Sequence, residues 1–152
     1  MTLSEDTVHM VDISSKPVVK RVAEAVGELV LQSATIDAIK SKSIKKGDVL
    51  AISEIAGIQA AKRTWDLIPL CHQIPLASVN ISFKIERSRV RARCNVNASY
   101  STGVEMEALV GVSVALLSVW DMVKYLEKDE NGQYPVACIE KIRVTKKTKE
   151  AV

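Results

Sequence analysis

Asp121 and Lys124 are the two residues whose types and spacing best suit proton transfer in this chain of 152 residues. Residues three apart on a helix share a face. The stretch before them, Ala108 to Trp120, carries no charge. The pair would therefore stand at the rim of a dry region, where pKa values shift and the groups can act as acid and base. A surface ion pair explains the same spacing, and the residues alone leave both interpretations open.

Glu105 and Glu107 are two further carboxylates beside the start of the same predicted helix. Thr102-Gly103-Val104-Glu105 fits a capping box, which would give Glu105 a structural role. Glu107 has no such role. A carboxylate offers two acceptors to two parallel donors, and the N1–H and 2-amino edge of guanine presents such a pair. Glu107 is therefore a candidate for binding a guanine-like edge.

Cys71 and His72 are neighbours in a loop that prolines at 69 and 75 would hold. Such a pair can serve a metal or a thiolate nucleophile. The only other histidine is His9, and the three cysteines lie far apart without a CxxC pair. The sequence predicts no metal site, no disulfide framework and a reducing compartment. A loop histidine with one hydrogen bond is the structural alternative.

Several cations could hold an anionic substrate, among them Arg21, Lys46 and Lys62. Each one taken singly is typical of a solvated surface charge. A triphosphate carries about four negative charges, so its site must gather several cations. The chain has no GxxxxGK[ST] loop that would do this locally.

The elements that must position these residues follow from periodicity and breakers. Residues 18–31 fit both a helix and a strand, and their β-branched content favours a strand. Two helices are predicted next, one capped by Ser33 over about 34–42 and one over about 55–67, before Pro69. Alternation over 79–98 predicts a hairpin with its turn near 87–88. A long helix from Thr102 to about Lys128 and a strand over 137–145 complete the chain.

This order predicts an α+β protein with the ferredoxin-like βαββαβ arrangement. That arrangement is a two-layer sandwich, with an antiparallel sheet and helices on one face. Residues 1–152 form a single domain in this interpretation, and about 1–8 and 146–152 are flexible ends.

Composition excludes some classes of function. The net charge is only +3, and Phe83 is the only phenylalanine, which disfavours a nucleic-acid-binding sheet. The charged residues on the outer face of the hairpin are expected to form cross-strand pairs in solvent. We expect no membrane span, because the longest uncharged stretch, 67–83, contains two prolines, and we expect a cytoplasmic protein.

Four stretches resemble the cyclic pyranopterin monophosphate synthases of molybdenum cofactor biosynthesis, from about His9 to Val144. They are His9–Asp12, Lys46–Val49, the long segment Ile55–His72 and Thr102–Leu109, and the Asp-Met-x-Lys of that family follows at 121–124. The resemblance implies a lyase that converts (8S)-3',8-cyclo-7,8-dihydroguanosine 5'-triphosphate to cyclic pyranopterin monophosphate and diphosphate.

The resemblance also implies roles for individual residues. Asp121 and Lys124 would be catalytic. The substrate-binding positions would be Leu70, Cys71, His72, Met106, Glu107, Lys46, Lys62 and Arg21. It leaves open which of the C-terminal lysines 141, 146 and 147 matches the lysine of the family.

Partners and cofactors follow in the same way. The resemblance implies a nucleotide substrate, no resident cofactor and a homohexamer built as a trimer of dimers with shared sites. It leaves open a magnesium ion on the substrate phosphates. The uncharged faces of 108–120 themselves predict a covering partner chain. Two rival classes of function are considered. A non-catalytic RNA- or ligand-binding module is disfavoured because the sheet lacks aromatic residues. A zinc cyclohydrolase is disfavoured because the chain lacks a set of zinc ligands.

Overall fold

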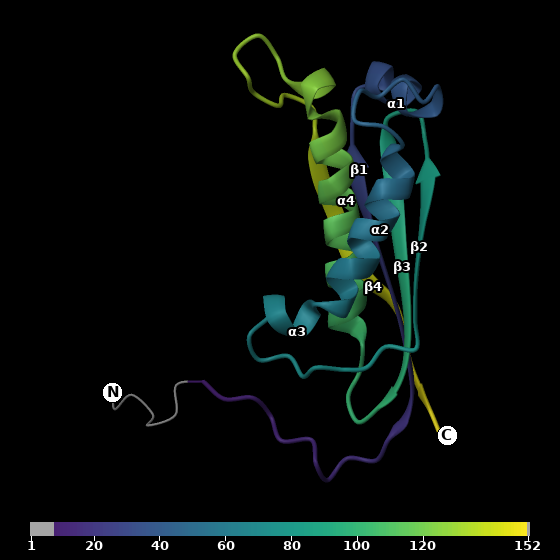
Figure 1. Ribbon diagram of the computed structural model, residues 1–152, viewed down its shortest axis with the longest axis vertical. Helices are drawn as coiled ribbons and strands as arrows, with labels where there is room; N and C mark the ends of the chain where they lie inside the picture. Colours follow the sequence, from purple (N-terminus) through teal and green to yellow (C-terminus); the bar gives the residue numbers. More distant parts are fainter. Residues whose placement is uncertain (1–7, 152) are drawn as a thin grey trace.

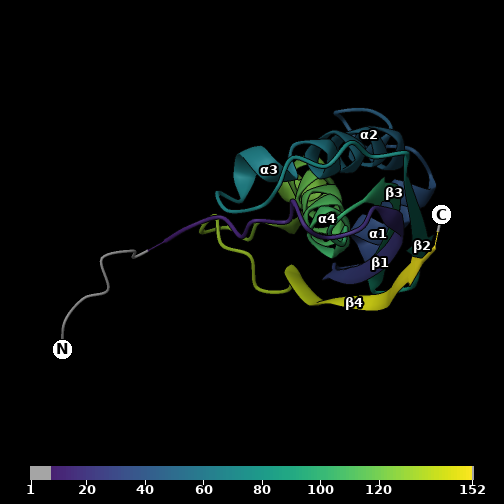
Figure 2. The same ribbon diagram turned by 90° about the horizontal axis from the view of Figure 1, so that it is seen from below.

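The computed structural model describes residues 8–151 and shows a four-stranded sheet with helices on one face (Figures 1 and 2). The strands are β1 (Val19–Val30), β2 (Ser78–Ile85), β3 (Arg89–Tyr100) and β4 (Cys138–Glu150). They lie in the order β2-β3-β1-β4, and every neighbouring pair is antiparallel. The helices are α1 (Ser33–Lys40), α2 (Val49–Lys62), α3 (Thr64–Leu67) and α4 (Glu105–Glu127). This confirms the predicted α+β, ferredoxin-like sandwich.

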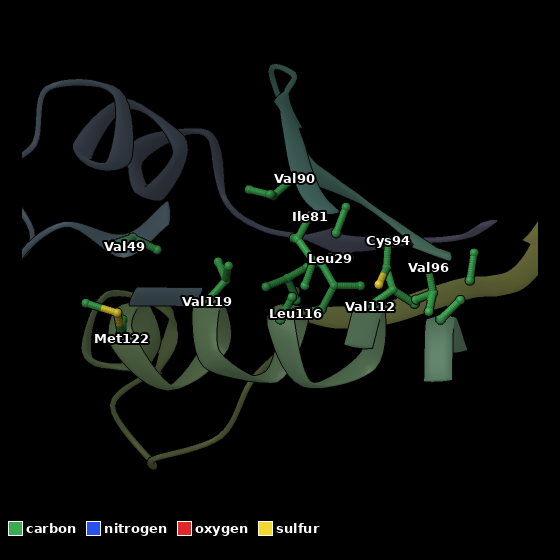
Figure 3. Packing of buried hydrophobic residues seen from close by; sticks show 14 of the residues in the cluster. Leu29, Val49, Ile81, Val90, Cys94, Val96, Val112, Leu116, Val119 and Met122 are labelled. Carbon is green, nitrogen blue, oxygen red and sulfur yellow. The ribbon is translucent and has the colours of Figure 1, made fainter. Parts of the chain in front are cut away.

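The core lies between the sheet and α4 (Figure 3). Alternate residues of β1 and β3 turn to the helices, among them Leu29, Cys94 and Val96, and all three are fully buried. From α4, Val112, Leu116 and Val119 pack against them. The apolar face of the hairpin, which follows a period of two, therefore packs against the apolar face of α4, as the sequence predicts.

α4 is long and apolar enough to cross a membrane by length and composition. Half of its most apolar 18-residue window is buried inside the protein. It packs on the sheet and on α2, so it serves as the central helix of this domain. Its 23 residues give a rod of roughly 35 Å at about 1.5 Å per residue.

Two glycines allow α2 and α4 to approach closely. A methyl group at Gly57 would meet the Ile81 side chain and would lie 2.8 Å from the Gly111 carbonyl oxygen. Near this crossing the hydroxyl of Ser53 donates to that of Ser118 at 3.0 Å. The two helices run antiparallel, so the start of α2 lies near the end of α4.

Two predicted helix boundaries are wrong. α2 begins at Val49 and not at Ile55, because the Asp48 carboxylate accepts from the Ala51 amide at 3.1 Å and caps the helix. The chain breaks at Arg63, so the predicted single helix to Leu67 is two helices.

The predicted caps are wrong as well. Ser33 is the first helical residue of α1 rather than its cap. The buried Glu127 carboxylate accepts from the amide of Gln32 at 3.1 Å and from the Thr35 hydroxyl. Val104 precedes α4 without any side-chain capping bond. The predicted capping box of Thr102 and Glu105 is therefore absent, and Glu105 loses its structural explanation.

The last strand is longer than predicted. Residues 146–150 were expected as a flexible end, yet β4 continues to Glu150 and pairs with β1 up to Lys20. Edge-strand residues are solvated on several sides, so a strand there can carry many charges and look like a tail in the sequence. The expected flexible residues 1–7 and 152 lie outside the described residues.

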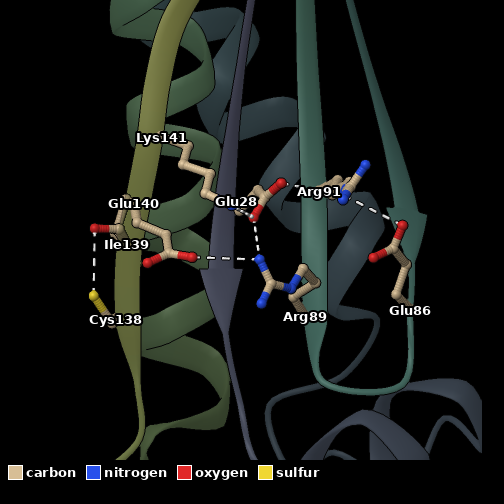
Figure 4. A network of polar contacts seen from close by, with 8 residues as sticks. All are labelled: Glu28, Glu86, Arg89, Arg91, Cys138, Ile139, Glu140 and Lys141. Carbon is tan, nitrogen blue, oxygen red and sulfur yellow. Dashed lines mark hydrogen bonds and ion pairs between the residues drawn. The ribbon is translucent and has the colours of Figure 1, made fainter.

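The open face of the sheet carries a charge network, as expected (Figure 4). Glu28 is at its centre and is buried by the cations around it. Arg89 pairs with Glu28 and Glu140, and Arg91 bridges Glu28 and Glu86 at 3.2 and 3.3 Å. These contacts hold the pKa of Glu28 below its usual range against the effect of its burial, which raises it. The face is thus satisfied internally through cross-strand pairs.

Candidate active site

Asp121, Lys124 and Lys46 form one cluster near the C-terminal end of α4. The Lys46 Nζ atom lies 2.9 Å from Asp121 Oδ2 and 3.2 Å from the Asp121 backbone oxygen. The Lys124 Nζ atom lies 3.2 Å from Asp121 Oδ1. α4 supplies two of the residues, and the loop before α2 supplies Lys46. The structure therefore brings together three of the predicted site residues.

The expected physical reason for the reactivity of Asp121 is wrong for the single chain. The Asp121 side chain is 57% exposed and does not lie in a dry region. Hydrogen bonds from Lys46 and then Lys124 hold its pKa below the usual range, and they outweigh the small opposing effect of burial. Asp121 is thus an ionised proton acceptor, matched by two ammonium donors.

The opposite end of α4 opens on a hollow of about 290 Å³, which we call the acidic hollow. Five predicted binding residues line it together: Leu70, Cys71, His72, Met106 and Glu107. The loop after α3 and the first turn of α4 supply them. Residues 8–18, here the N-terminal strap, form another wall, and the ring Nε2–H of His72 donates to the Val11 carbonyl at 2.6 Å.

Glu107 is the most unusual group in the acidic hollow. It is only 3% exposed, and its Oε2 atom has no hydrogen-bond partner. Burial, reinforced by the nearby charge of Glu105, raises its pKa to about 7. Burial, and then the charges of the same two carboxylates, raise the pKa of the Cys71 thiol. A buried acceptor without a donor is costly, so this carboxyl is suited to a ligand that brings N–H donors.

Glu105 belongs to the same hollow and was missed as a site residue. Its Oε1 atom pairs with the Nζ of Lys147 at 3.2 Å, and its Oε2 is buried without a partner. Gly103 leaves the room for this carboxylate, because a methyl group there would collide with it. Of the three C-terminal lysines left open by the sequence, Lys147 is therefore the one that reaches the site.

A second hollow of about 690 Å³ adjoins the first, and we call it the basic hollow. Its cations are Lys16, Arg21, Lys147 and Lys149, against the acids Glu105 and Glu150. Arg21 lies on β1, and its Nε donates to the carbonyl of Tyr100 on β3 at 3.4 Å. Four cations in one concavity fit a polyanionic ligand. The predicted binding residue Arg21 thus lies beside the acidic hollow rather than in it.

Lys62 stands apart from both hollows. It lines a separate hollow with Trp65, Gln73 and Leu76, and this hollow shares only Ile74 with the acidic one. Lys62 lies at the C-terminal end of α2, on the same end of the molecule. The structure does not bring it into contact with Glu107 or His72.

The two groups of predicted site residues lie at opposite ends of α4 in one chain. Asp121 follows Glu107 by 14 positions, which is about 21 Å along a helix at 1.5 Å per residue. The Asp121 carboxylate therefore lines neither hollow of its own chain.

Residues 8–151 contain no group of three or more His, Cys, Asp or Glu residues that could hold a metal ion. The three cysteines are all free.

Comparison with known proteins identifies the family. The MoaC family matches residues 10–150, nearly the whole chain. The chain belongs to this family. The matched range contains every residue of the cluster and of the acidic hollow, and all residues of the basic hollow except Ala151.

Three MoaC relatives illustrate the likeness. A protein of Methanothermobacter thermautotrophicus, named a probable cyclic pyranopterin monophosphate synthase accessory protein, is 54% identical over 95% of this chain and 91% of its own. Probable cyclic pyranopterin monophosphate synthases of Archaeoglobus fulgidus and Thermococcus kodakarensis are 53% and 55% identical. Each match covers 97% of this chain and 94% of the relative.

Proposed function

We propose that this MoaC-family chain is a cyclic pyranopterin monophosphate synthase, a lyase of molybdenum cofactor biosynthesis. It converts (8S)-3',8-cyclo-7,8-dihydroguanosine 5'-triphosphate to cyclic pyranopterin monophosphate and diphosphate. Relatives that carry this name are more than 50% identical over nearly the whole chain. The observation that carries the proposal in this structure is the pairing of a buried, unpartnered carboxyl at Glu107 with an adjoining hollow of four cations.

The two hollows suit the two ends of such a substrate. The guanine-derived ring system offers N–H donors, and the Oε2 atoms of Glu105 and Glu107 are buried acceptors without donors. The triphosphate offers oxygens, and Arg21 and Lys147 lie in the hollow next to those acceptors. The donor-rich end of the ligand therefore matches the acceptors of the acidic hollow, and its anionic end matches the cations of the basic hollow.

The phosphate chemistry is a displacement within the substrate. The oxygen of a sugar hydroxyl forms a bond to the innermost phosphorus, and the bond from that phosphorus to the next bridging oxygen breaks. The electron pair leaves with diphosphate, and the proton of the hydroxyl passes to water. Cations placed in advance of the reaction stabilise the charge that develops on the leaving group.

Opening and closing the purine-derived rings needs proton transfers, which we assign to Asp121 and Lys124. The pKa of Asp121 is lowered by Lys46 and Lys124, so the carboxylate is in the form that accepts a proton. Lys124 at 3.2 Å is a donor in the ammonium form. Lys46 keeps the carboxylate ionised and in place.

We propose further that each complete site forms between two chains. Asp121 and Glu107 are about 21 Å apart in one chain, so a second copy must supply the cluster that faces the hollows. Apolar side chains are exposed on the outer faces of the helices, including Ile52 and Ile55 of α2 and Leu117 of α4, and a partner chain would cover them. The number of chains in the assembly comes from the family resemblance, which implies a homohexamer built as a trimer of dimers.

The remaining assignments complete the proposal. The enzyme uses no resident cofactor, and a magnesium ion on the substrate phosphates is an option that the assay must include. The site of action is the cytoplasm, which the three free cysteines support. No nucleic-acid or membrane partner is involved, which the internally paired charges of the open sheet face support.

Turnover is the decisive test. The purified chain, incubated with the cyclised triphosphate with and without magnesium, should release diphosphate and the cyclic monophosphate in equal amounts. A folded protein without turnover in either condition would favour the accessory role for which one relative is named.

The shared site has its own test. Light scattering should give a mass several times 16.6 kDa. Asp121→Asn and His72→Gln chains, each inactive alone, should regain activity after joint dissociation and reassembly. Random dimers would restore about a quarter of the wild-type rate, because half of them are mixed and each mixed dimer has one intact site of two. A monomer, or an oligomer without any regained activity, would refute the shared site.

A further inference from the structure

We propose that Lys16, on the N-terminal strap, binds the innermost phosphate of the substrate at the junction of the acidic and basic hollows. The inference rests on the proposed function, because it takes from there a ligand with a guanine-derived end and a triphosphate end. It adds to that function a residue of the strap that the sequence did not single out.

The position of Lys16 is the first observation. The two hollows share four lining residues: Lys16, Thr102, Gly103 and Glu105. A ligand that fills both hollows has to pass these four. Lys16 is the only cation among them. The part of the substrate that lies between its ring system and its outer phosphates is the innermost phosphate, so Lys16 lies beside it.

The charge of Lys16 is available for a ligand. No ion pair in the described part of the chain, residues 8–151, involves this lysine. Glu105, the acid that shares the junction, already pairs with Lys147 at 3.2 Å. The Lys16 side chain is exposed to solvent, so its ammonium can turn to an anion without breaking an existing bond.

The strap is held in place on both sides of Lys16. On the N-terminal side, Val11 accepts from His72 at 2.6 Å, and Asp12 Oδ1 accepts from the Ser14 amide at 2.8 Å. A turn then brings the Lys16 amide to the Ile13 carbonyl at 3.1 Å. On the C-terminal side Pro17 restricts the backbone, and β1 starts at Val19.

The strap thus crosses the end of the molecule where α4 begins, as Figure 2 shows in purple. Its two anchors and its turn fix the place of the Lys16 backbone while leaving the side chain free. This is the arrangement of a positioned phosphate-binding residue rather than of a solvated tail. The strap also joins the two binding functions, since His72 in the acidic hollow holds the segment that carries the cation.

Removal of the Lys16 charge gives a direct test. We compare Lys16→Met, which keeps an unbranched side chain, with Lys20→Met, an exposed lysine four residues away on β1. The probe is guanosine 5'-monophosphate, which carries a guanine end and only the innermost phosphate, titrated by calorimetry into the assembled wild type and both variants. Lys16→Met should weaken binding of this monophosphate roughly tenfold, as expected for loss of one charge-assisted hydrogen bond. Lys20→Met should leave it unchanged, and Lys16→Arg should restore most of it.

Turnover separates this inference from the proposed function. Lys16 is supported as a phosphate ligand if the wild-type enzyme makes product and only Lys16→Met has a raised KM and a lowered kcat. If the wild type is active and the two methionine variants bind guanosine 5'-monophosphate equally well and turn over alike, the role of Lys16 is refuted and the proposed function stands. If the wild type is inactive, the proposed function itself fails.

A merely structural role of Lys16 is distinguishable as well. Hydrogen exchange of the strap amides, residues 8–18, should be the same in Lys16→Met and wild type. Faster exchange of the strap together with weaker binding would assign the effect to loosening of the strap and would overturn the proposal. If Lys16→Met does not fold, Lys16→Gln is measured in the same way.

Discussion

The Nζ of Lys46 lies 2.9 Å from the Oδ2 of Asp121, although 75 residues separate them in the chain. Lys46 precedes α2 and Asp121 is near the end of α4, and the antiparallel packing of the two helices brings them together. The close crossing at Gly57 and Gly111 makes this packing possible. This ion pair of the candidate site therefore depends on two glycines that bear no chemistry of their own.

Asp121→Asn and Lys124→Ala should each lower kcat by at least about 100-fold, the range expected for loss of a general acid or base. Both side chains are partly exposed, so the fold should be retained. Turnover is measured beside circular dichroism and thermal melting. Asp37→Asn, an exposed carboxylate on α1, is the matched control. Near-normal turnover in both variants would contradict the assignment.

Lys46→Ala should raise the pKa of Asp121, because the hydrogen bond from Lys46 is the largest cause of its lowering. Lys124 remains as a second partner of Asp121 in Lys46→Ala. The pKa of Asp121 in this variant should therefore stay below its pKa in the double variant that also carries Lys124→Ala. Carbon NMR of the labelled aspartate carboxyls follows the titration directly. In kcat/KM the acidic limb should move to higher pH. An unchanged Asp121 titration would show that Lys46 has no electrostatic role.

Glu107→Gln should make the stability of the free protein less dependent on pH. Burial raises the pKa of Glu107 from 4.5 to about 7, so the folded state holds this proton more tightly than the unfolded state does. The resulting stability is present below pH 4.5 and is lost as the pH rises to about 7, by up to about 3 kcal/mol.

Urea unfolding of both proteins between pH 4.5 and 7.5, at one protein concentration, measures this difference. The wild type should lose stability across the window while Glu107→Gln stays nearly flat. Parallel curves would mean that Glu107 is not protonated in the folded state.

Particular residues show how far the sequence could lead. Alternation at Ile81, Phe83 and Val90 gave the hairpin, because a half-buried strand needs one apolar face. The ends of elements were harder. Asp48 caps α2 through a local bond to the Ala51 amide, so that boundary was within reach of the sequence. Glu127, in contrast, accepts from the amide of Gln32, 95 positions away, at the start of α1. A local sequence pattern does not contain such a distant partner.

The candidate site divides in the same way. His72, Glu107 and Met106 fall in one hollow as the resemblance implies. Lys147 was one of three open choices, since register along β4 decides which lysine faces Glu105. Lys16 had no local signal, because only the folded strap places it over the hollows.

Gly57→Ala should destabilise the protein by about 1–3 kcal/mol, the range for overpacking in a core. Alanine favours helices by up to about 1 kcal/mol over glycine, so the loss reflects contact with Ile81 and with the Gly111 carbonyl. Gln59→Ala, an exposed change on the same helix, is the control. Ile81→Val in the same chain should recover part of the loss. Equal midpoints for Gly57→Ala and Gln59→Ala would contradict the close crossing.

Thr35→Val should cost about 1–3 kcal/mol, because it removes a donor from the buried Glu127 carboxylate. Ser33→Ala should cost little, since α1 takes its cap from Glu127 and Ser33 makes no capping bond. The sequence pattern alone predicts the reverse order, with about 1 kcal/mol for loss of a serine cap. Unfolding midpoints of the two variants in urea decide between them.

The final strand has a consequence for how the chain tolerates shortening. Residues 146–150 look dispensable in the sequence, but they hydrogen-bond along β1 and carry Lys147 and Lys149 to the basic hollow. A carboxypeptidase that removed them would take away two of its four cations and expose the β1 segment that holds Arg21 in place. Proteolytic trimming at this end would thus weaken anion binding in the basic hollow while leaving the hydrophobic core intact.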